Sequence, residues 1–378
     1  MATFPVLDPH DIVASTLLWH DSIDRQLTVL RETSKEYATK LKLPSDPKCR
    51  VCLLLVEPRE HPWSEFVIRN WTKMCVSLGA SLMIAHGSTN GGFMKEICKD
   101  FANVQYLDLG VPDLPIERYN LVLTDPRFWA NMPHEHLLLI QTDTMCLQPP
   151  NLDELEAFDY VGAPWTLDNP ATKRTFDRLG PRDPVGVVDG HAMPELWPSV
   201  SGNGGLSWRK RSAMIKICEA FQLQKAHDLL KGRLSAIDET SLEAEAIRAR
   251  LATPVLTSKV GERPIQNEDV MFAVGCRRVD GLRLGTREVS ARFSCECIRP
   301  EGFHLPTATL CGLHKVYIYQ PTDTVRHLLA LSQIDPGAPE APDWETEVRV
   351  ALRRQATKDY DPSDRIRQAT DRILTGDV

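Results

Sequence analysis

The sequence predicts an α/β protein with a mainly parallel central sheet flanked by helices. Short apolar runs alternate with amphipathic stretches between residues 50 and 141, and Gly79 and Pro126 stand where helices of this pattern would end or break. Hydrophobic residues make up 42% of the 378-residue chain, which is enough for a large core. Strand–helix alternation of this kind is typical of parallel sheets that helices cover on both faces.

Each element follows from its local pattern. The expected strands are continuous apolar runs such as "RVCLLLV", which is the pattern of strands buried on both faces. The expected helices, such as "SEFVIRNWTKMCVSLG", carry apolar residues at three- and four-residue spacing. We expect strands at 50–56, 81–86, 103–109 and 136–141, and helices at 64–79, 92–101 and, in two pieces, 115–132.

Composition changes divide the chain into three parts. Residues 1–45 are predicted to be an N-terminal helical segment, because apolar residues recur at near-helical spacing until "KLPSDPK". Residues 46–332 form the predicted main domain, in which the Pro-, Asp- and Gly-rich stretch 168–199 is expected to be a long loop or an active-site flap. Residues 333–378 are predicted to be a peripheral C-terminal extension.

Charge and cysteine usage exclude several classes of protein. A formal net charge of −7 argues against a nucleic-acid binder that relies on a positive field. No apolar window is long enough to span a bilayer, and the N-terminus does not resemble a signal peptide. The ten cysteines are scattered, several of them in apolar contexts, so we expect reduced thiols and a cytoplasmic location.

A single acid follows the fourth expected strand. In "HLLLIQTDTMCL" the apolar run ends at Ile140, and Asp143 comes three residues later. Ligands of open α/β sheets bind at the carboxyl ends of the strands. Asp143 is therefore expected at the edge of the sheet where a nucleotide would bind.

The stretch "SGNGGLSWRKR" places a glycine-rich loop directly before an expected helix. Its residues Gly202, Asn203, Gly204 and Gly205 permit close backbone approach, and a helix N-terminus offers free N–H groups to an anion or a sugar hydroxyl. A tight turn into a helix explains the loop equally well. The spacing is not that of a dinucleotide fingerprint.

Two further stretches carry candidate functional residues. In "QNEDVMFAVG", Glu268 and Asp269 precede an expected helix; the helix dipole favours acids there, and a general base with a hydroxyl-orienting partner is the functional alternative. In "TLCGLHKVY", His314 follows a glycine, and a lone histidine is more often a core or surface residue than a metal ligand.

Several of these stretches recur together in one family. Taken in order, "VEPRE", "YNLVLTDPRFW", "LLLIQTDTM", "FDYVGAPW", "GNGGLSWRKRSAM", "NEDVMFAVG", "RFSCE" and "GLHK" resemble a little-characterised microbial family of GT-A-like glycosyltransferases. The resemblance covers about residues 50–318. It implies a GT-A-like, Rossmann-like fold, a nucleotide-diphosphate sugar donor, a divalent cation, and transfer of a sugar to an acceptor hydroxyl.

The resemblance also implies a metal site. Asp143 matches the acid that binds the metal in GT-A enzymes, and Gln141 stands where many members have a second Asp. The metal would then need another protein ligand, and His314 is expected to supply it, as a C-terminal histidine does in several GT-A families. A mixed oxygen and nitrogen shell favours Mn²⁺ over Mg²⁺. Thr144 is expected to bind the cation or orient water.

Further roles follow from the same resemblance. Val56 and Arg59 would lie at the base and ribose, although a surface salt bridge is an equal alternative for Arg59. Asn203 in the glycine loop would contact sugar hydroxyls, and Trp165 would stack on a sugar or fill core. The interpretation assigns Asp269 as the base that takes the acceptor proton, with Glu268 holding the acceptor or the donor sugar.

Other readings of the sequence remain open. A non-catalytic nucleotide- or glycan-binding protein of the same fold is one, because only one acid follows the fourth strand. Another nucleotide-using transferase or a Rossmann oxidoreductase is less well supported, because "VEPREHPW" lacks a glycine loop for phosphate after the first strand. The sequence does not choose the donor, the acceptor, the stereochemical outcome or the oligomeric state.

Overall fold

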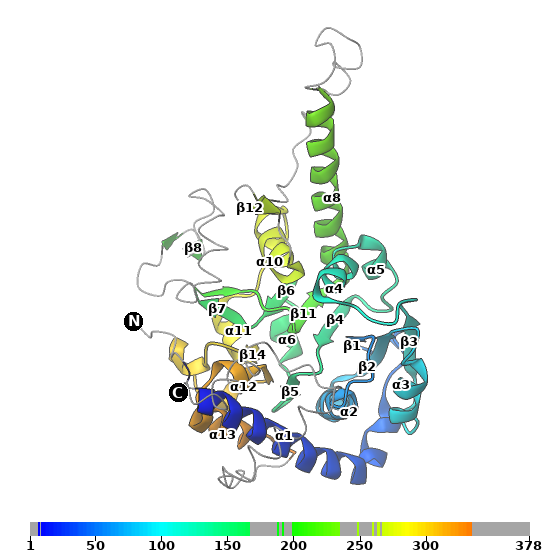
Figure 1. Ribbon diagram of the computed structural model, residues 1–378, viewed down its shortest axis with the longest axis vertical. Helices are drawn as coiled ribbons and strands as arrows, with labels where there is room; N and C mark the ends of the chain where they lie inside the picture. Colours follow the sequence, from blue (N-terminus) through cyan, green and yellow to red (C-terminus); the bar gives the residue numbers. More distant parts are fainter. Residues whose placement is uncertain are drawn as a thin grey trace.

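A six-stranded mixed sheet forms the centre of the protein (Figure 1). The computed structural model describes residues 7, 9–166, 187–188, 191–192, 199–234, 248, 259–260, 263–264 and 267–334. The sheet has the order β3-β2-β1-β4-β11-β6. Its strands are β1 (Val51–Glu57), β2 (Ala80–His86), β3 (Val104–Asp108), β4 (His136–Ile140), β6 (Tyr160–Gly162) and β11 (Leu206–Lys210).

The strands β3, β2, β1 and β4 run parallel to one another, whereas β11 lies between β4 and β6 and is antiparallel to both. The predicted helix directly after the glycine loop is therefore wrong: the loop leads into β11, and the helix begins only at Arg211. Trp208 of this strand is fully buried in the core. The reason is non-local, because β11 gains partners on both edges that its own sequence does not reveal.

Helices cover both faces of the sheet (Figure 1). One face carries α1, α2 and α3, and the other carries α4, α5, α8 and α10. Their bounds are α1 Pro9–Glu32, α2 Ser64–Cys75, α3 Gly91–Ile97, α4 Ile116–Leu123, α5 Pro126–Ala130, α8 Arg211–Leu234 and α10 Glu268–Arg278. The four strands predicted from the sequence and the helices between them are confirmed to within a few residues at most ends.

Alternation along the strands produces two cores. In β1, Leu53 and Leu55 pack with α1 and α2, whereas Cys52 and Leu54 pack with α4, α5 and α8. Side chains of a strand point alternately to its two faces, so a strand covered on both sides must be apolar throughout. Every residue of β1 is buried, which explains the apolar run from Val51 to Val56 that precedes its last residue, Glu57.

A small three-stranded sheet joins the end of β4 to the C-terminal part of the fold. It contains β5 (Thr144–Cys146), β14 (Ser294–Cys295) and β15 (Gly312–His314) in the order β14-β15-β5. Because β15 is antiparallel to β5, His314 stands opposite Thr144. The pairing brings the end of β15 to the carboxyl edge of the central sheet.

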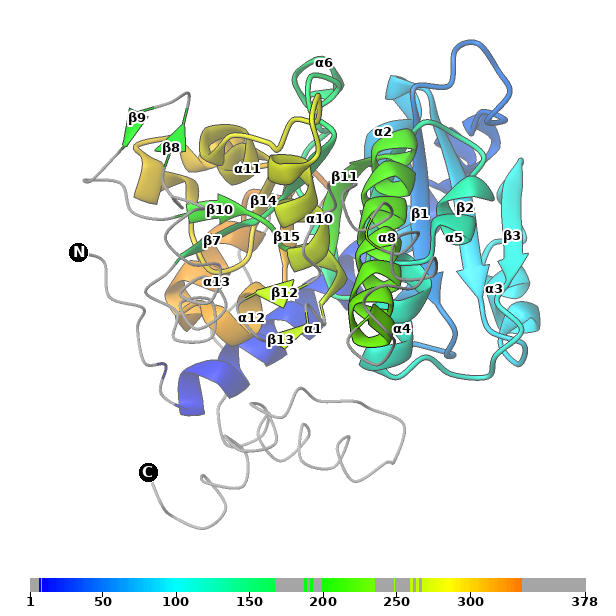
Figure 2. The same cartoon turned by 90° about the horizontal axis from the view of Figure 1, so that it is seen from above.

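The N-terminal helix packs into the main domain. Trp19 of α1 contacts Tyr317 with ring centroids 5.2 Å apart, and the helix also packs on α2 and α13. In Figure 2 the elements α11, α12 and α13 lie on the side of the sheet away from β3. Their bounds are α11 Arg287–Phe293, α12 Val316–Tyr319 and α13 Thr322–Leu329.

Apart from five short 3-10 helices, the remaining described elements are one short α-helix and six short strands. They are α6 Leu152–Leu155 and the strands β7 Pro164–Thr166, β8 Val187–Val188, β9 His191–Ala192, β10 Ser199–Ser201, β12 Lys259–Val260 and β13 Arg263–Pro264. Most of the predicted flap and nearly all of the predicted C-terminal extension lie outside the described residues.

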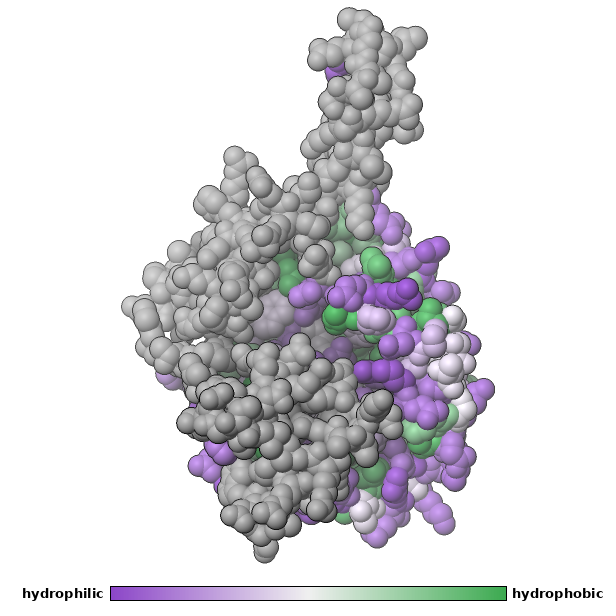
Figure 3. All heavy atoms as spheres, in the orientation of Figure 1, coloured by the Kyte–Doolittle hydropathy of each residue, from purple (hydrophilic) through white to green (hydrophobic). Residues whose placement is uncertain are grey.

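The surface is mixed in character. On the face drawn in Figure 3 the described surface is mostly hydrophilic, with scattered hydrophobic atoms. Large exposed hydrophobic side chains among the described residues are Leu43, Ile116 and Leu121. Along the described ranges, no helix combines the length and apolar character that crossing a membrane requires.

Candidate functional site

Asp143 lies just beyond the carboxyl end of β4 and faces two basic side chains. Its Oδ1 is 3.3 Å from Nε2 of His314, and its Oδ2 is 3.2 Å from Nζ of Lys315. The Lys315 amide also donates a hydrogen bond to the Asp143 carbonyl oxygen at 3.2 Å. The structure thus brings together Asp143 and His314, which the sequence analysis assigned to one metal site.

The opposite charges in this cluster each stabilise the ionised form of their neighbours. Burial opposes ionisation of Asp143, but Lys315 and His314 outweigh it and hold the pKa of that carboxyl well below its usual range. Burial likewise opposes the charge on His314, and the carboxylates of Asp143 and Glu296 outweigh it and raise the pKa of the imidazole. Asp143 is therefore a carboxylate at neutral pH.

The facing atoms of Asp143 and His314, Oδ1 and Nε2, have a spacing that fits two ligands of a divalent cation. Asp143 Oδ1 and His314 Nε2 are buried and make no well-aligned hydrogen bond to any residue that the structure describes. Adjacent ligands of an octahedral ion with bonds of about 2.1 Å stand about 3 Å apart, close to the 3.3 Å between these two atoms. Across the described ranges, no three His, Cys, Asp or Glu side chains form a metal-binding group. Phosphate oxygens and water would supply the other positions on an ion.

Glu296 completes this cluster and was not among the predicted site residues. It is buried, and its Oε1 lies 3.3 Å from Nδ1 of His314 and accepts a hydrogen bond of 2.9 Å from the side-chain amide of Asn203. A carboxylate on the far nitrogen of a histidine fixes the ring, as it does for metal-binding histidines. The only sequence signal for Glu296 was its position in the motif "RFSCE". The residues of that stretch do not indicate whether the acid is buried or exposed.

The glycine loop fits closely between His314 and Glu268. A Cβ atom on Gly205 would lie 2.1 Å from His314 Nε2, and one on Gly204 would lie 2.4 Å from Glu268 Oε1. No side chain fits at either position without displacing its neighbour. Glycine is therefore needed at both positions, because the loop backbone lies close to His314 and Glu268. The side chain of Asn203 bonds within the protein: its Oδ1 accepts a 2.8 Å hydrogen bond from the Gly205 amide.

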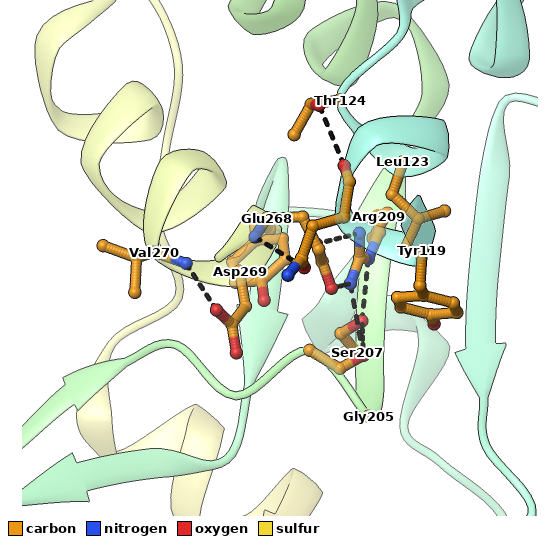
Figure 4. Close-up of polar contacts among 12 residues, drawn as sticks. Tyr119, Leu123, Thr124, Gly205, Ser207, Arg209, Glu268, Asp269 and Val270 are labelled. Carbon is orange, nitrogen blue, oxygen red and sulfur yellow. Dashed lines mark hydrogen bonds and ion pairs between the residues drawn. The ribbon is translucent and has the colours of Figure 1, made fainter. Parts of the chain in front are cut away.

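Arg209 holds Glu268, the first acid of the pair, in place (Figure 4). Its guanidinium is fully buried and donates to both carboxylate oxygens of Glu268, at 2.7 and 3.0 Å. The same group donates to the Gly204 carbonyl and the Ser207 hydroxyl. Three aromatic rings surround it, with centroids 5.2–5.5 Å away: Trp129, Tyr160 and Phe272. The charges of Arg209 and Glu268 are thus paired, and both carboxylate oxygens of Glu268 are occupied by Arg209.

Asp269 differs from Glu268 in forming no ion pair with any residue that the structure describes. It lies in the first turn of α10, is half-buried, and accepts a hydrogen bond of 2.7 Å from the Val270 amide. Figure 4 shows its carboxylate turned away from the Arg209–Glu268 pair. Burial and the neighbouring charge of Glu268 raise the pKa of Asp269 to about 7. A carboxylate with this pKa suits a general base near neutral pH.

The loop after β1 is held rigidly at the same edge of the sheet. Arg59 forms an ion pair with Glu57 at 2.9 Å, and the side-chain amide of Asn90 donates to the carbonyl oxygens of both residues. The salt-bridge alternative for Arg59 is thus observed. Val56 is buried in the core, so its backbone rather than its side chain lies near the edge.

Two other predicted site residues, Thr144 and Trp165, make contacts within the protein. Thr144 is fully buried; its hydroxyl donates to the Gln141 carbonyl at 2.7 Å and accepts from the Trp71 indole at 3.0 Å. These bonds hold Thr144 at the start of β5 and close the turn that follows β4. Trp165 is half-buried, and its ring packs closely on Gly202, where a Cβ atom would lie 2.4 Å from it.

Comparison with known proteins identifies the family but not the activity. A family profile described as "Protein of unknown function (DUF5672)" matches residues 103–314, which is 212 of the 378 residues. The match contains Asp143, the glycine loop and the acidic pair, and it ends at His314. No curated protein matches the chain. Because the profile spans more than half of the sequence, the chain belongs to the DUF5672 family, whose function is unknown.

Proposed function

We propose that the protein is a metal-dependent glycosyltransferase of GT-A-like fold that moves a sugar from a nucleotide-diphosphate donor to an acceptor hydroxyl. One observation carries the proposal: a candidate cation pair, Asp143 and His314, and a candidate base, Asp269, are linked through one glycine loop. The parallel order β3-β2-β1-β4 supports the proposal, because ligands of open α/β sheets bind beyond the carboxyl ends of the strands. The motif resemblance noted above supports the same reaction class.

Asp143 and His314 would hold a divalent cation, with Mn²⁺ favoured over Mg²⁺ by the mixed oxygen and nitrogen ligands. The bound cation would supply Lewis-acid stabilisation of the departing diphosphate. Glu296 would keep the His314 ring in place, because it contacts the opposite nitrogen.

Asp269 would act on the acceptor. In an inverting transfer the acceptor oxygen attacks the anomeric carbon, the bond from that carbon to the diphosphate breaks, and the acceptor proton passes to the Asp269 carboxylate. Its pKa of about 7 makes the carboxylate basic enough for this role and still largely ionised in mildly alkaline solution. Glu268 would position Asp269 through Arg209 rather than contact the substrate.

The test is turnover of a panel of nucleotide-diphosphate sugars with Mn²⁺, followed as hydrolysis and as transfer to added acceptors. Asp269→Asn should lower turnover by about 10²- to 10⁴-fold, and Asp143→Ala should abolish the dependence on Mn²⁺. Asp323→Asn, at a side chain that is 92% exposed on α13, is the control and should change neither. Unchanged turnover in Asp143→Ala would refute the metal role.

A second function is favoured by the pairing of Glu268. Since Arg209 already occupies both oxygens of that carboxylate, the site keeps fewer reactive groups than the sequence indicates. A non-catalytic nucleotide- or glycan-binding protein would show tight binding in isothermal titration and no product from any donor and acceptor pair. Turnover with any pair would exclude it.

A further inference from the structure

Lys315 contacts the carboxylate of the candidate cation site. Its ammonium lies 3.2 Å from Asp143 Oδ2, while its side chain remains 36% exposed. The other oxygen of the same carboxylate, Oδ1, faces His314. One carboxylate therefore faces both the lysine and the position proposed for a cation.

The backbone fixes this arrangement. Lys315 has φ +50°, in the left-handed region that non-glycine residues seldom adopt. Its amide donates to the Asp143 carbonyl, and it directly follows β15, which pairs with β5. Left-handed backbone at a non-glycine residue persists where the surrounding structure determines it, and such residues concentrate at functional sites.

We propose that Lys315 is the resident counter-ion of Asp143 and that it makes uptake of the cation depend on a diphosphate. This inference rests on the proposed function and extends it to the order of binding. A divalent cation beside Asp143 must share the carboxylate with the ammonium of Lys315, and the two positive charges repel each other. The protein alone therefore binds the cation weakly.

A diphosphate reverses this balance. Its negative charges attract the cation and the ammonium together, so Lys315 turns from Asp143 to a phosphate oxygen while the cation takes the carboxylate. A lysine ammonium is suited to this exchange because it is a compact charge on a flexible stem. Its exposed fraction leaves room for the movement. Lys315 thus weakens cation binding in the protein alone, and it binds a phosphate oxygen when a diphosphate is present.

The experiment compares two probes by isothermal titration: Mn²⁺ alone, and the preformed complex of Mn²⁺ with inorganic pyrophosphate. Lys315→Met removes the charge and keeps a stem of similar length. It should bind Mn²⁺ alone about tenfold more tightly and the pyrophosphate complex about tenfold more weakly. Lys315→Arg keeps the charge and should restore both affinities to within about threefold of the unsubstituted protein.

Lys42→Met is the matched control. Lys42 is 35% exposed and lies 3.9 Å from Asp46, and its amide donates to Ala80, the first residue of β2, at the opposite edge of the sheet. It should leave both affinities unchanged. Thermal unfolding of each variant shows whether the fold is retained.

The outcomes separate this inference from the proposed function. Opposite changes for the two probes in Lys315→Met support the counter-ion role. Changes in the same direction, or none, overturn it while leaving the metal site intact. If the unsubstituted protein binds neither probe, the metal site of the proposed function fails, and the inference fails with it.

Discussion

The guanidinium of Arg209 and the carboxylate of Glu268 form a bidentate ion pair in which both side chains are buried. Arg209 comes from β11 and Glu268 from the first turn of α10, so the pair ties an interior strand of the sheet to the start of that helix. Because Asp269 is the next residue, the same pair sets the position of the candidate base.

Removing one partner of this pair should strongly destabilise the protein. Arg209→Met or Glu268→Gln leaves a buried charge without its partner, and the expected loss in the free energy of unfolding is about 3–5 kcal/mol. Urea denaturation measures it. Lys99→Met, which breaks the exposed pair with Glu96, is the control and should cost less than about 1 kcal/mol. Equal effects at the two sites would contradict the structural role of Arg209.

A methyl group on Gly205 should disturb the cation site. In Gly205→Ala the new Cβ would lie 2.1 Å from His314 Nε2, so the ring must move from Asp143. We expect affinity for the Mn²⁺–pyrophosphate complex to fall at least about tenfold, with a loss of stability of about 1–3 kcal/mol. Gly92→Ala is the control, because apart from its own helix no described atom lies within 4 Å of its added Cβ. Retained affinity in Gly205→Ala would place the cation elsewhere.

The raised pKa of Asp269 predicts how stability changes with pH. The unfolded chain releases this proton near pH 4, and the folded protein keeps it up to about pH 7. Between these values the folded state binds more protons, so this carboxyl contributes stability at low pH that is lost as the pH rises to about 7. Because the side chain is only half-buried, we expect a contribution of about 1–2 kcal/mol.

Asp269→Asn checks this directly, because the amide does not titrate. Urea denaturation across pH 4 to 8 should show the variant gaining stability relative to the unsubstituted protein as the pH rises. Asp323→Asn, at an exposed side chain, controls for an Asp-to-Asn substitution away from the site. A constant difference between Asp269→Asn and the unsubstituted protein would mean that the pKa of Asp269 is not raised.

Substitutions of Glu296 test whether it positions His314. Glu296→Gln keeps an oxygen for both His314 and the Asn203 amide, which share Oε1, so affinity for Mn²⁺–pyrophosphate should stay within about threefold. Glu296→Ala removes that oxygen and should weaken binding by about 10- to 100-fold. The electron paramagnetic resonance spectrum of bound Mn²⁺ reports the change at the ion itself. If Gln and Ala behave alike, charge rather than positioning is the contribution of Glu296.

The sequence by itself determined the first half of the fold and the place of several candidate residues. Continuous apolar runs predicted β1, β2 and β4, because strands covered on both faces need apolar residues on both. Gly79 was predicted to end a helix, and it follows a 3-10 turn after α2 with φ +77°. Asp143 was correctly placed beyond the end of β4. These features depend on neighbours close in the sequence.

The tertiary structure decided the rest. The strand β11 was mistaken for a helix because its partners, β4 and β6, are set by non-local pairing. The same pairing buries Arg209 and joins it to Glu268, 59 residues away. Glu296 meets His314 and Asn203 only after the chain has folded. Local patterns place residues on elements, but which side chains share a buried site depends on how distant elements pack.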